Sequence, residues 1–300
     1  MTQGKLVASP LLHNCHGSRP TEVFEDFFPD GIASIDFAHE ARTLLVATRR
    51  GHLTILSQSG DRLFENLNFG SLSKAVIAHS GDIGAAVVDQ NRLVCFNRSL
   101  KQLWDASITG RITSLAIAPH GSHIAFGTDS CRLHIVATDR REIAKIDTRR
   151  PVEHIAFLED EPELIAAAEF GQMCRYSLKG KEIWSEQLLN NVGDLCLAAG
   201  ARKMFLAAFN HGVQVYEFTG EQLGSFAIDG IPSRVSASAT QSRVAVATLE
   251  NRIFWLNFEG EIQWAVDISQ DPPMHICAGP LGDRLFMATQ SGCLLQVSWP

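Results

Sequence analysis

The sequence lacks every compact motif by which nucleotide-binding and hydrolytic enzymes are commonly identified. It contains no GxGxxG, GxxxxGK[ST], GxSxG or HExxH; His39-Glu40 begins the last of these, but Thr43 stands where its second histidine would be. Such motifs supply the phosphate cradle, the nucleophile or the metal ligands of their reactions. We therefore expect neither an enzyme nor a bound cofactor.

Long apolar runs and paired cysteines are also missing. No stretch approaches the roughly 20 apolar residues that a membrane-spanning helix requires. The N-terminal segment, interrupted by Ser9 and Pro10, is a poor match to a signal peptide. The seven cysteines are odd in number and include no CxxC, and most lie in apolar patterns where a thiol acts as a small hydrophobe. These features favour a reducing cytoplasm and no membrane.

Charge of neither sign dominates. The chain has 26 Lys and Arg against 33 Asp and Glu, a formal net charge of -7. A mild negative charge favours solubility over bulk binding of nucleic acid. A nucleic-acid interface would need a broad basic surface with stacking aromatics, so we do not expect one.

What the sequence does contain is a repeat of forty residues. Large aromatic side chains recur at multiples of this spacing, at Phe24, Phe64, Trp104, Trp184 and Trp264. Each unit has short apolar runs, such as VAVAT and RIFWL, separated by Gly, Asn, Asp and Pro. This pattern is typical of antiparallel strands rather than helices. A four-stranded unit has two apolar faces, which radial packing of the units buries.

The repeats predict a single seven-bladed β-propeller with four-stranded antiparallel blades over residues 20–300. The last unit reaches Pro300 without a fourth strand, while Phe24 lies forty residues before Phe64. We therefore expect an N-terminal strand at about residues 22–30 to complete the last blade and close the ring, which would remove exposed sheet edges. We expect residues 1–19 to form a loosely ordered arm.

The second half of each unit resembles the quinoprotein-like (PQQ-like) propeller repeat, in which a turn ending in Gly-Lys or Gly-Glu precedes a Trp. The clearest matches run from Ser177 to Trp184 and from Asn257 to Trp264. The first half resembles a WD repeat, as in residues 112–121. The resemblance covers residues 22–300; it implies the propeller fold and says little about function, because one fold hosts many activities.

Two departures from these families bear on function. WD repeats usually carry Trp-Asp at the end of the third strand, whereas Phe96-Asn97 stands there, and Trp104-Asp105 lies in the outer strand. Quinone-dependent dehydrogenases of the superfamily typically have adjacent cysteines beside the cofactor, and no Cys-Cys pair occurs here. We therefore expect no quinone cofactor.

Polar residues recur at one register position of the innermost strand of each unit. They are Ser34, Lys74, Ser114, His154, Asp194, Arg234 and, shifted by one residue, His275. Because this strand borders the channel of a propeller, we expect a polar ring near one mouth, where Lys74, His154 and Arg234 are suited to hold an anion. The alternative is a solvated lining that merely avoids unpaired buried groups.

The loops expected at the same mouth are divided by charge. The first half of the chain contributes Arg49, Arg50, Arg111, Arg149 and Arg150. The second half contributes Glu169, Asp229, Glu250 and Asp271. The alternative is that both sets are ordinary solvated loops.

The N-terminal arm carries three side chains of metal-ligand type, His13, Cys15 and His16. Their spacing is too tight for a usual structural zinc site, and no fourth ligand is evident. We therefore expect a polar arm rather than a metal site.

Together these features favour a non-enzymatic scaffold, a monomeric propeller within a complex, that binds a protein partner through its charged loop face. Loops on a rigid frame present contacts at little ordering cost. The alternative is a small-ligand sensor or a hydrolase-like enzyme that uses the channel ring, with His154 as its acid or base. The ring supplies only one carboxylate, Asp194, which weakens the enzyme hypothesis.

Overall fold

The computed structural model describes residues 9–168 and 170–300, which form an all-β structure as the repeat predicts. In these residues the only helical segments are two single 3-10 turns, η1 (Pro10–Leu12) and η2 (Ala199–Ala201). No helix of this described part is long and apolar enough to cross a membrane. Every strand pairing is antiparallel, and most of the six sheets have four strands.

The first three sheets follow the chain without interruption, and each contains four consecutive strands. One consists of β3 (Ile32–Ala38), β4 (Thr43–Thr48), β5 (Leu53–Leu56) and β6 (Arg62–Asn66). The next consists of β7 (Leu72–Ile77), β8 (Ile83–Val88), β9 (Arg92–Asn97) and β10 (Gln102–Ser107). The third consists of β11 (Ile112–Ile117), β12 (His123–Thr128), β13 (Arg132–Ala137) and β14 (Glu142–Asp147).

The following sheet has seven strands because one long strand serves two neighbouring units. It consists of β15 (Val152–Phe157), β16 (Glu163–Ala168), β17 (Phe170–Ser177), β18 (Glu182–Ala198), β19 (Lys203–Ala208), β20 (Gly212–Glu217) and β21 (Gln222–Phe226). The first part of β18 pairs with β17, and the part from Val192 onward pairs with β19. Each part of β18 therefore belongs to its own group of four strands.

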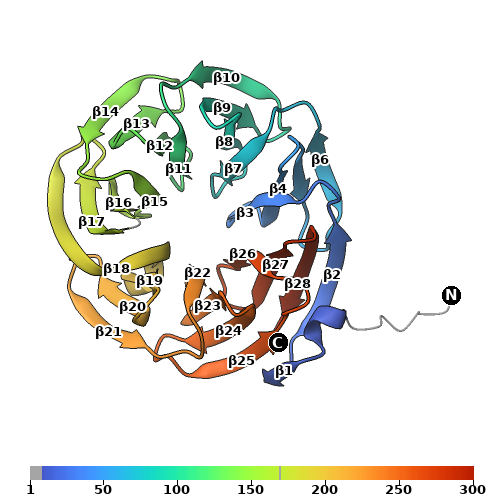
Figure 1. Cartoon of the computed structure of the whole chain (residues 1–300). Helices are drawn as coiled ribbons and strands as arrows, with labels where there is room; N and C mark the ends of the chain where they lie inside the picture. The colour runs from blue at the N-terminus through green and yellow to red at the C-terminus, as the bar shows by residue number, and fades with distance from the viewer. Residues whose placement is uncertain (1–8, 169) are drawn as a thin grey trace.

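The last two sheets contain the C-terminal strands, and each also takes a strand from the N-terminal segment. One consists of β22 (Pro232–Ala237), β23 (Arg243–Thr248), β24 (Arg252–Asn257), β25 (Ile262–Asp267) and β1 (Cys15–Gly17). The other consists of β26 (Pro273–Ala278), β27 (Arg284–Thr289), β28 (Cys293–Ser298) and β2 (Thr21–Phe27). Figure 1 shows the sheets following one another around a common centre, with β2 lying beside β28.

The second strand of each unit is rich in alanine because the sheets come closest together near this centre. Ala85 and Ala86 in β8 are fully buried, as are Ala245 and Ala247 in β23. Farther out, larger side chains fill the wider space between sheets, as the buried Trp255 in β24 and Trp264 in β25 do. The change in side-chain size thus follows the widening of the gap between neighbouring sheets.

The expectation of a loosely ordered arm is wrong for the described part of residues 1–19. The strand β1 pairs with the edge of β25, Leu12 is buried in the cluster that contains Trp264, and Trp299 donates its Nε1–H to the Ser18 carbonyl at 2.8 Å. An open sheet edge offers unpaired backbone groups, and η1 places an apolar side chain beside it. The arm is thereby fixed to the sheet.

Phe24 lies where the repeat predicts, in a strand paired with β28. It pairs with Gln296 and is buried among Phe28, Phe286 and Leu294. The repeat of aromatic residues therefore identified the packing position of Phe24 correctly, whereas Phe64 at the equivalent position is exposed.

Phe24→Ala is expected to lower the free energy of unfolding by roughly 3–5 kcal/mol, the usual cost of emptying a buried aromatic site. Phe27→Ala is the matched control, because Phe27 lies in the same strand but is 56% exposed, against 9% for Phe24. Urea unfolding of both variants beside the wild type is the measurement. Equal losses in the two variants would contradict the importance of this packing.

Candidate functional site

The polar ring position coincides with a β-bulge in every inner strand. We call β3, β7, β11, β15, residues 192–198 of β18, β22 and β26 the inner strands. In each, the register with the second strand shifts just before the polar residue, as between Ile32 and Ser34 or between Leu72 and Lys74. A bulge bends a strand and redirects the next side chain. This local irregularity turns the ring residues toward the centre.

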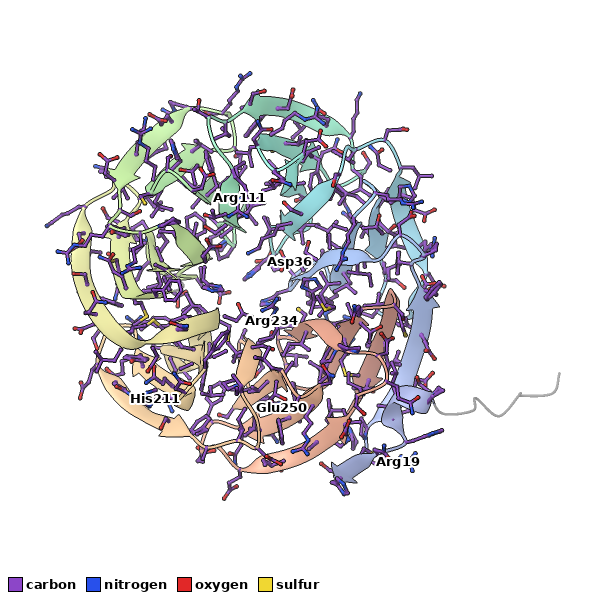
Figure 2. The ribbon with its side chains drawn as sticks, in the orientation of Figure 1. Arg19, Asp36, Arg111, His211, Arg234 and Glu250 are labelled. Atoms are coloured by element: carbon purple, nitrogen blue, oxygen red, sulfur yellow. The ribbon has the colours of Figure 1, made fainter. Side chains whose placement is uncertain are left out.

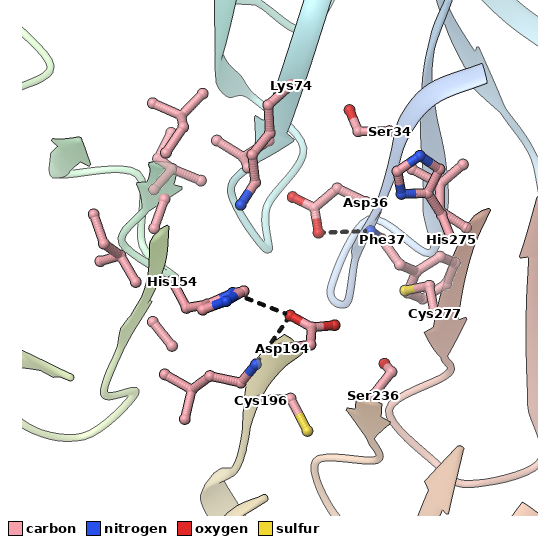
Figure 3. Close-up of a pocket in the computed structure, with 18 of the residues that line it drawn as sticks. Ser34, Asp36, Phe37, Lys74, His154, Asp194, Cys196, Ser236, His275 and Cys277 are labelled. Atoms are coloured by element: carbon pink, nitrogen blue, oxygen red, sulfur yellow. Dashed lines mark hydrogen bonds and ion pairs between the residues drawn. The ribbon is translucent and has the colours of Figure 1, made fainter. Parts of the chain in front are cut away.

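The ring residues line a central cavity of about 510 Å³, with one exception. In Figure 3 the side chains of Lys74, His154 and Asp194 point into the same space. Ser114 instead lines an adjoining pocket of about 310 Å³, which Lys74 also borders. Six of the seven residues therefore share one cavity: Ser34, Lys74, His154, Asp194, Arg234 and His275.

Most of these side chains are hydrogen-bonded to the backbone of the next inner strand. The Ser34 hydroxyl accepts from the Ala75 N–H at 2.8 Å, and the Ser114 hydroxyl donates to the Val152 carbonyl at 2.6 Å. Because equivalent residues are forty apart, each of these bonds joins one sheet to the next. These ring side chains therefore join neighbouring sheets and provide hydrogen-bond partners for polar groups buried near the axis.

Asp194 is held from two sides. Its carboxylate accepts a hydrogen bond from the Val235 N–H at 3.2 Å. On the other side, His154 Nδ1 lies 3.6 Å from Asp194 Oδ1. The second ring nitrogen of this histidine, Nε2, lies 3.3 Å from the Val192 carbonyl oxygen. Burial alone would raise the pKa of Asp194, but the hydrogen bond and charge of His154 and the charge of Arg234 outweigh it, so the pKa lies below its ordinary value. Asp194 is therefore a stabilised carboxylate.

Arg234 is also bound by neighbouring backbone. Its Nε donates to the Met274 carbonyl at 3.2 Å and one terminal nitrogen donates to the Ser233 carbonyl at 2.7 Å. The same terminal nitrogen also donates to the Gly193 carbonyl at 3.5 Å, and together these bonds fix the guanidinium beside the cavity.

Lys74 and His275 differ from the other ring residues. In the part of the chain that the structure describes, neither side chain makes a hydrogen bond or a salt bridge. Burial lowers the pKa of Lys74 against the opposing effect of Asp194 and Asp36, and burial together with Arg234 lowers the pKa of His275 to about 4. Lys74 is thus a cation inside the cavity that no described group binds directly.

A second layer of cavity residues escaped the sequence analysis. Asp36 lies two positions beyond Ser34 and accepts from the Ile77 N–H at 2.7 Å, and Ser236 accepts from the Ala278 N–H at 2.9 Å. Burial raises the pKa of Asp36 to about 6, although the Ile77 N–H and Lys74 oppose this. The sequence does contain a signal for Asp36, because the equivalent positions of the other repeats hold mostly apolar residues and cysteines.

The five expected arginines lie in loops of the first half of the chain, at the channel end at which the inner strands begin. Arg49 is joined to Gly31 through its backbone, and Arg111 lines the pocket beside Lys74. Arg50 pairs with Asp30 at 3.4 Å, and Arg150 lies over the Phe170 ring at 5.7 Å. Figure 2 shows Arg111 and Arg234 near the centre of the sheets. All five side chains are exposed: Arg49, Arg50, Arg111, Arg149 and Arg150.

The carboxylates of the acidic loops at this mouth form hydrogen bonds or ion pairs with neighbouring segments of the chain. Glu250 accepts from the Ile231 N–H at 2.8 Å, Asp271 accepts from the Ser291 N–H at 2.9 Å, and Asp229 pairs with Arg252. These bonds fix turns in place, as capping carboxylates do in loops generally. The fourth expected acid, Glu169, lies outside the described residues.

The three potential metal ligands of the arm lie against β25 rather than around a common point. His13, Cys15 and His16 line a cavity of about 590 Å³ together with Asp229 and Asp267. Across residues 9–168 and 170–300, no group of three or more His, Cys, Asp or Glu side chains is arranged to hold a metal ion.

Comparisons with known proteins do not extend this picture. No protein-family model matches the sequence, and no curated protein matches it. The site must therefore be interpreted from its own geometry.

Asp36→Asn is expected to gain stability relative to the wild type as the pH rises from about 4 to about 6. The pKa of Asp36 is about 6 in the folded chain and about 3.9 when unfolded. Over this window the folded form keeps a proton that the unfolded form has lost, so wild-type stability falls as pH rises. The asparagine variant escapes that loss. Urea unfolding at intervals from pH 4 to pH 7.5 is the measurement.

Asp194→Asn provides a control of opposite sign in the same cavity. A carboxylate with a depressed pKa stabilises the folded chain above its unfolded pKa, and the contribution is lost as the pH falls. The difference in the free energy of unfolding between the wild type and Asp194→Asn should therefore shrink as the pH falls. Parallel wild-type and Asp36→Asn curves would contradict the raised pKa of Asp36.

Proposed function

We propose that the chain is a seven-bladed propeller, closed by β2, that acts as a non-enzymatic interaction module. Dividing β18 at Val192 turns the seven-stranded sheet into two groups of four strands. With the other five sheets this makes seven units, and β2 pairs with the C-terminal strand β28. The likeness of the repeats to quinoprotein-like and WD propellers is consistent with this arrangement.

A binding role accounts for the cavity better than catalysis does. Two of the cavity's acid–base side chains already have partners: His154 lies beside Asp194 and the Val192 carbonyl, and Asp194 accepts from Val235. A general base needs a free path to the proton it removes. These groups are committed to joining the inner strands.

The proposal rests on a difference between the basic and the acidic side chains at this mouth. Within the described residues, the side chains of Arg49, Arg111 and Arg149 make no hydrogen bond or salt bridge, whereas Glu250 and Asp271 each accept a backbone hydrogen bond from a neighbouring loop. Of the two expected sets, the side chains left without a bond are therefore these arginines, and Lys74 adds a cation within the channel. We infer that the partner is a protein that presents an acidic segment to this mouth.

The seven cysteines, which are all free, support a reducing compartment, and we propose a cytoplasmic location. Burial raises the pKa of Cys196 and of Cys277, both of which line the cavity. A raised thiol pKa disfavours the reactive thiolate. These cysteines therefore pack as small apolar groups.

Charge reversal of Arg111 and Arg149 together to Glu should reduce capture of the native partner from host extract at least tenfold. Exposed charges that steer association should also make wild-type capture weaken as salt rises, because screening acts beyond about 8 Å at physiological ionic strength. Immobilised wild type and variant, compared by quantitative mass spectrometry at several salt concentrations, provide the measurement.

The matched control reverses two exposed cations at the opposite mouth, Arg98 and Lys181. This variant has the same change in net charge and should retain the captured proteins. If both variants lose the same proteins, bulk charge rather than the basic mouth explains binding, and the proposal is wrong.

The central cavity favours one alternative, binding of a small anion near Lys74, Arg234 and His275. Under that hypothesis, inorganic phosphate or citrate should raise the thermal unfolding temperature of the wild type, since a ligand that binds only the folded state stabilises it. Lys74→Met should abolish the rise. An equal response of both proteins would remove the alternative.

A further inference from the structure

The docking of β1 shows that an outer strand of this fold accepts an added strand. Cys15, His16 and Gly17 pair with Val266, Ala265 and Trp264. At the two ends of this pairing, the Asp267 N–H donates to the Asn14 carbonyl at 3.2 Å and the Ser18 N–H donates to the Gln263 carbonyl at 2.9 Å. The backbone of an extended segment thus forms hydrogen bonds with the backbone groups at the open edge of β25.

A similar edge and groove occur three repeats earlier, at β14. A cavity of about 270 Å³ lies between the sheet of β7–β10 and the sheet of β11–β14. Its apolar wall includes Leu93, Trp104 and Phe126, and the Phe126 ring stacks on His134 at 4.8 Å. The Trp104 indole donates to the Thr138 carbonyl at 2.7 Å and spans the two sheets.

The residues beside β14 occupy the same repeat positions as those beneath the N-terminal arm. Arg132, His134, Lys145 and Asp147 correspond to Arg252, Phe254, Ala265 and Asp267, each 120 residues later. In both sheets the arginine and the aspartate of this set are cross-strand partners. At β25 the groove is lined by His13 to His16. At β14, no strand of the described chain covers the edge.

The charge of the edge residue distinguishes β14 from the other outer strands. The residues at this register are Glu25, Glu65, Asp105, Lys145, Ser185, Ser225 and Ala265. Lys145 is the one cation of the series and is exposed, and Arg132 and Arg140 lie on the same groove. Opposite charges directly across an antiparallel pair are favourable and like charges are not. An added strand with an acidic side chain opposite this position is therefore favoured at β14 and disfavoured at β2, β6 and β10.

We propose that the edge of β14 and its groove bind an extended segment of a protein partner that places an acidic side chain opposite Lys145. The segment adds to the sheet as β1 adds to β25, with main-chain hydrogen bonds providing affinity and side-chain contacts providing specificity. The acidic side chain lies on the groove face, because directly opposed residues of an antiparallel pair share a face. This surface is separate from the basic mouth and its assignment does not depend on the function proposed there.

The test uses the full chain and a synthetic peptide of residues 9–19 carrying Cys15→Val and His16→Glu, which places glutamate in the position opposite Lys145. Fluorescence anisotropy of the labelled peptide should show saturable binding. Lys145→Glu in the protein should weaken this binding at least tenfold, and a peptide with His16→Lys should restore it. Because Lys145 is exposed on an edge strand, the variant is expected to fold.

Two controls separate strand addition from charge attraction. Arg42→Glu reverses an exposed cation in the turn between β3 and β4, in a sheet that is not next to that of β14, and should leave peptide affinity unchanged. A peptide with Ser18→Pro lacks the N–H that would donate to the Ile143 carbonyl, the counterpart of Gln263, and should bind at least fivefold more weakly. Full affinity of the proline peptide would overturn strand addition.

Amide hydrogen exchange locates the bound peptide. The proposal requires new protection in Glu142–Asp147. Protection confined to Ile262–Asp267 would mean that the peptide displaces β1, and this outcome, or an absence of saturable binding, would overturn the proposal.

Discussion

The hydrogen bonds between neighbouring inner strands are the interaction on which the centre of this structure depends. A polar side chain of one inner strand bonds the backbone of the next, as Ser34 does with Ala75 and Asp194 does with Val235. A β-bulge precedes each of these side chains and directs it inward. The same ring that would line a binding cavity is therefore also the set of contacts that joins the sheets at their closest approach.

The bonds between the ring residues and the neighbouring strands explain why the cavity is polar. Buried polar groups that lack partners are costly, and most ring residues avoid this cost by bonding backbone. Lys74 does not. Its ammonium faces Asp36 and Asp194 across the cavity without a direct bond, and burial lowers its pKa. We propose that this buried cation is held for binding rather than for the stability of the fold.

Much of the fold was predictable because its determinants are local and repeated. Alternating apolar runs, turn residues and the spacing of Phe24 and Trp104 depend only on the sequence near each strand, and they predicted the all-β class and the packing position of Phe24. The polar register of the inner strands was visible for the same reason. Its members were predicted to lie together, and the cavity holds most of them.

The remainder depends on contacts between distant segments. Nothing near Leu12 indicates that the arm will pack beside Trp264, which lies at the other end of the chain. The acidic loops appeared free because Ser291, the partner of Asp271, belongs to a later turn. Asp36 was missed because one acid among apolar counterparts is a weak pattern until the cavity is seen.

The division of the ring into structural and binding residues is tested most directly by the free energy of unfolding of Lys74→Met, measured in urea without added ligand. If Lys74 is held for binding, the variant should be at least as stable as the wild type, because methionine removes a cation that burial disfavours. A loss of more than about 2 kcal/mol, the scale of a broken buried network, would contradict this account and would show that Lys74 joins the sheets as its neighbours do.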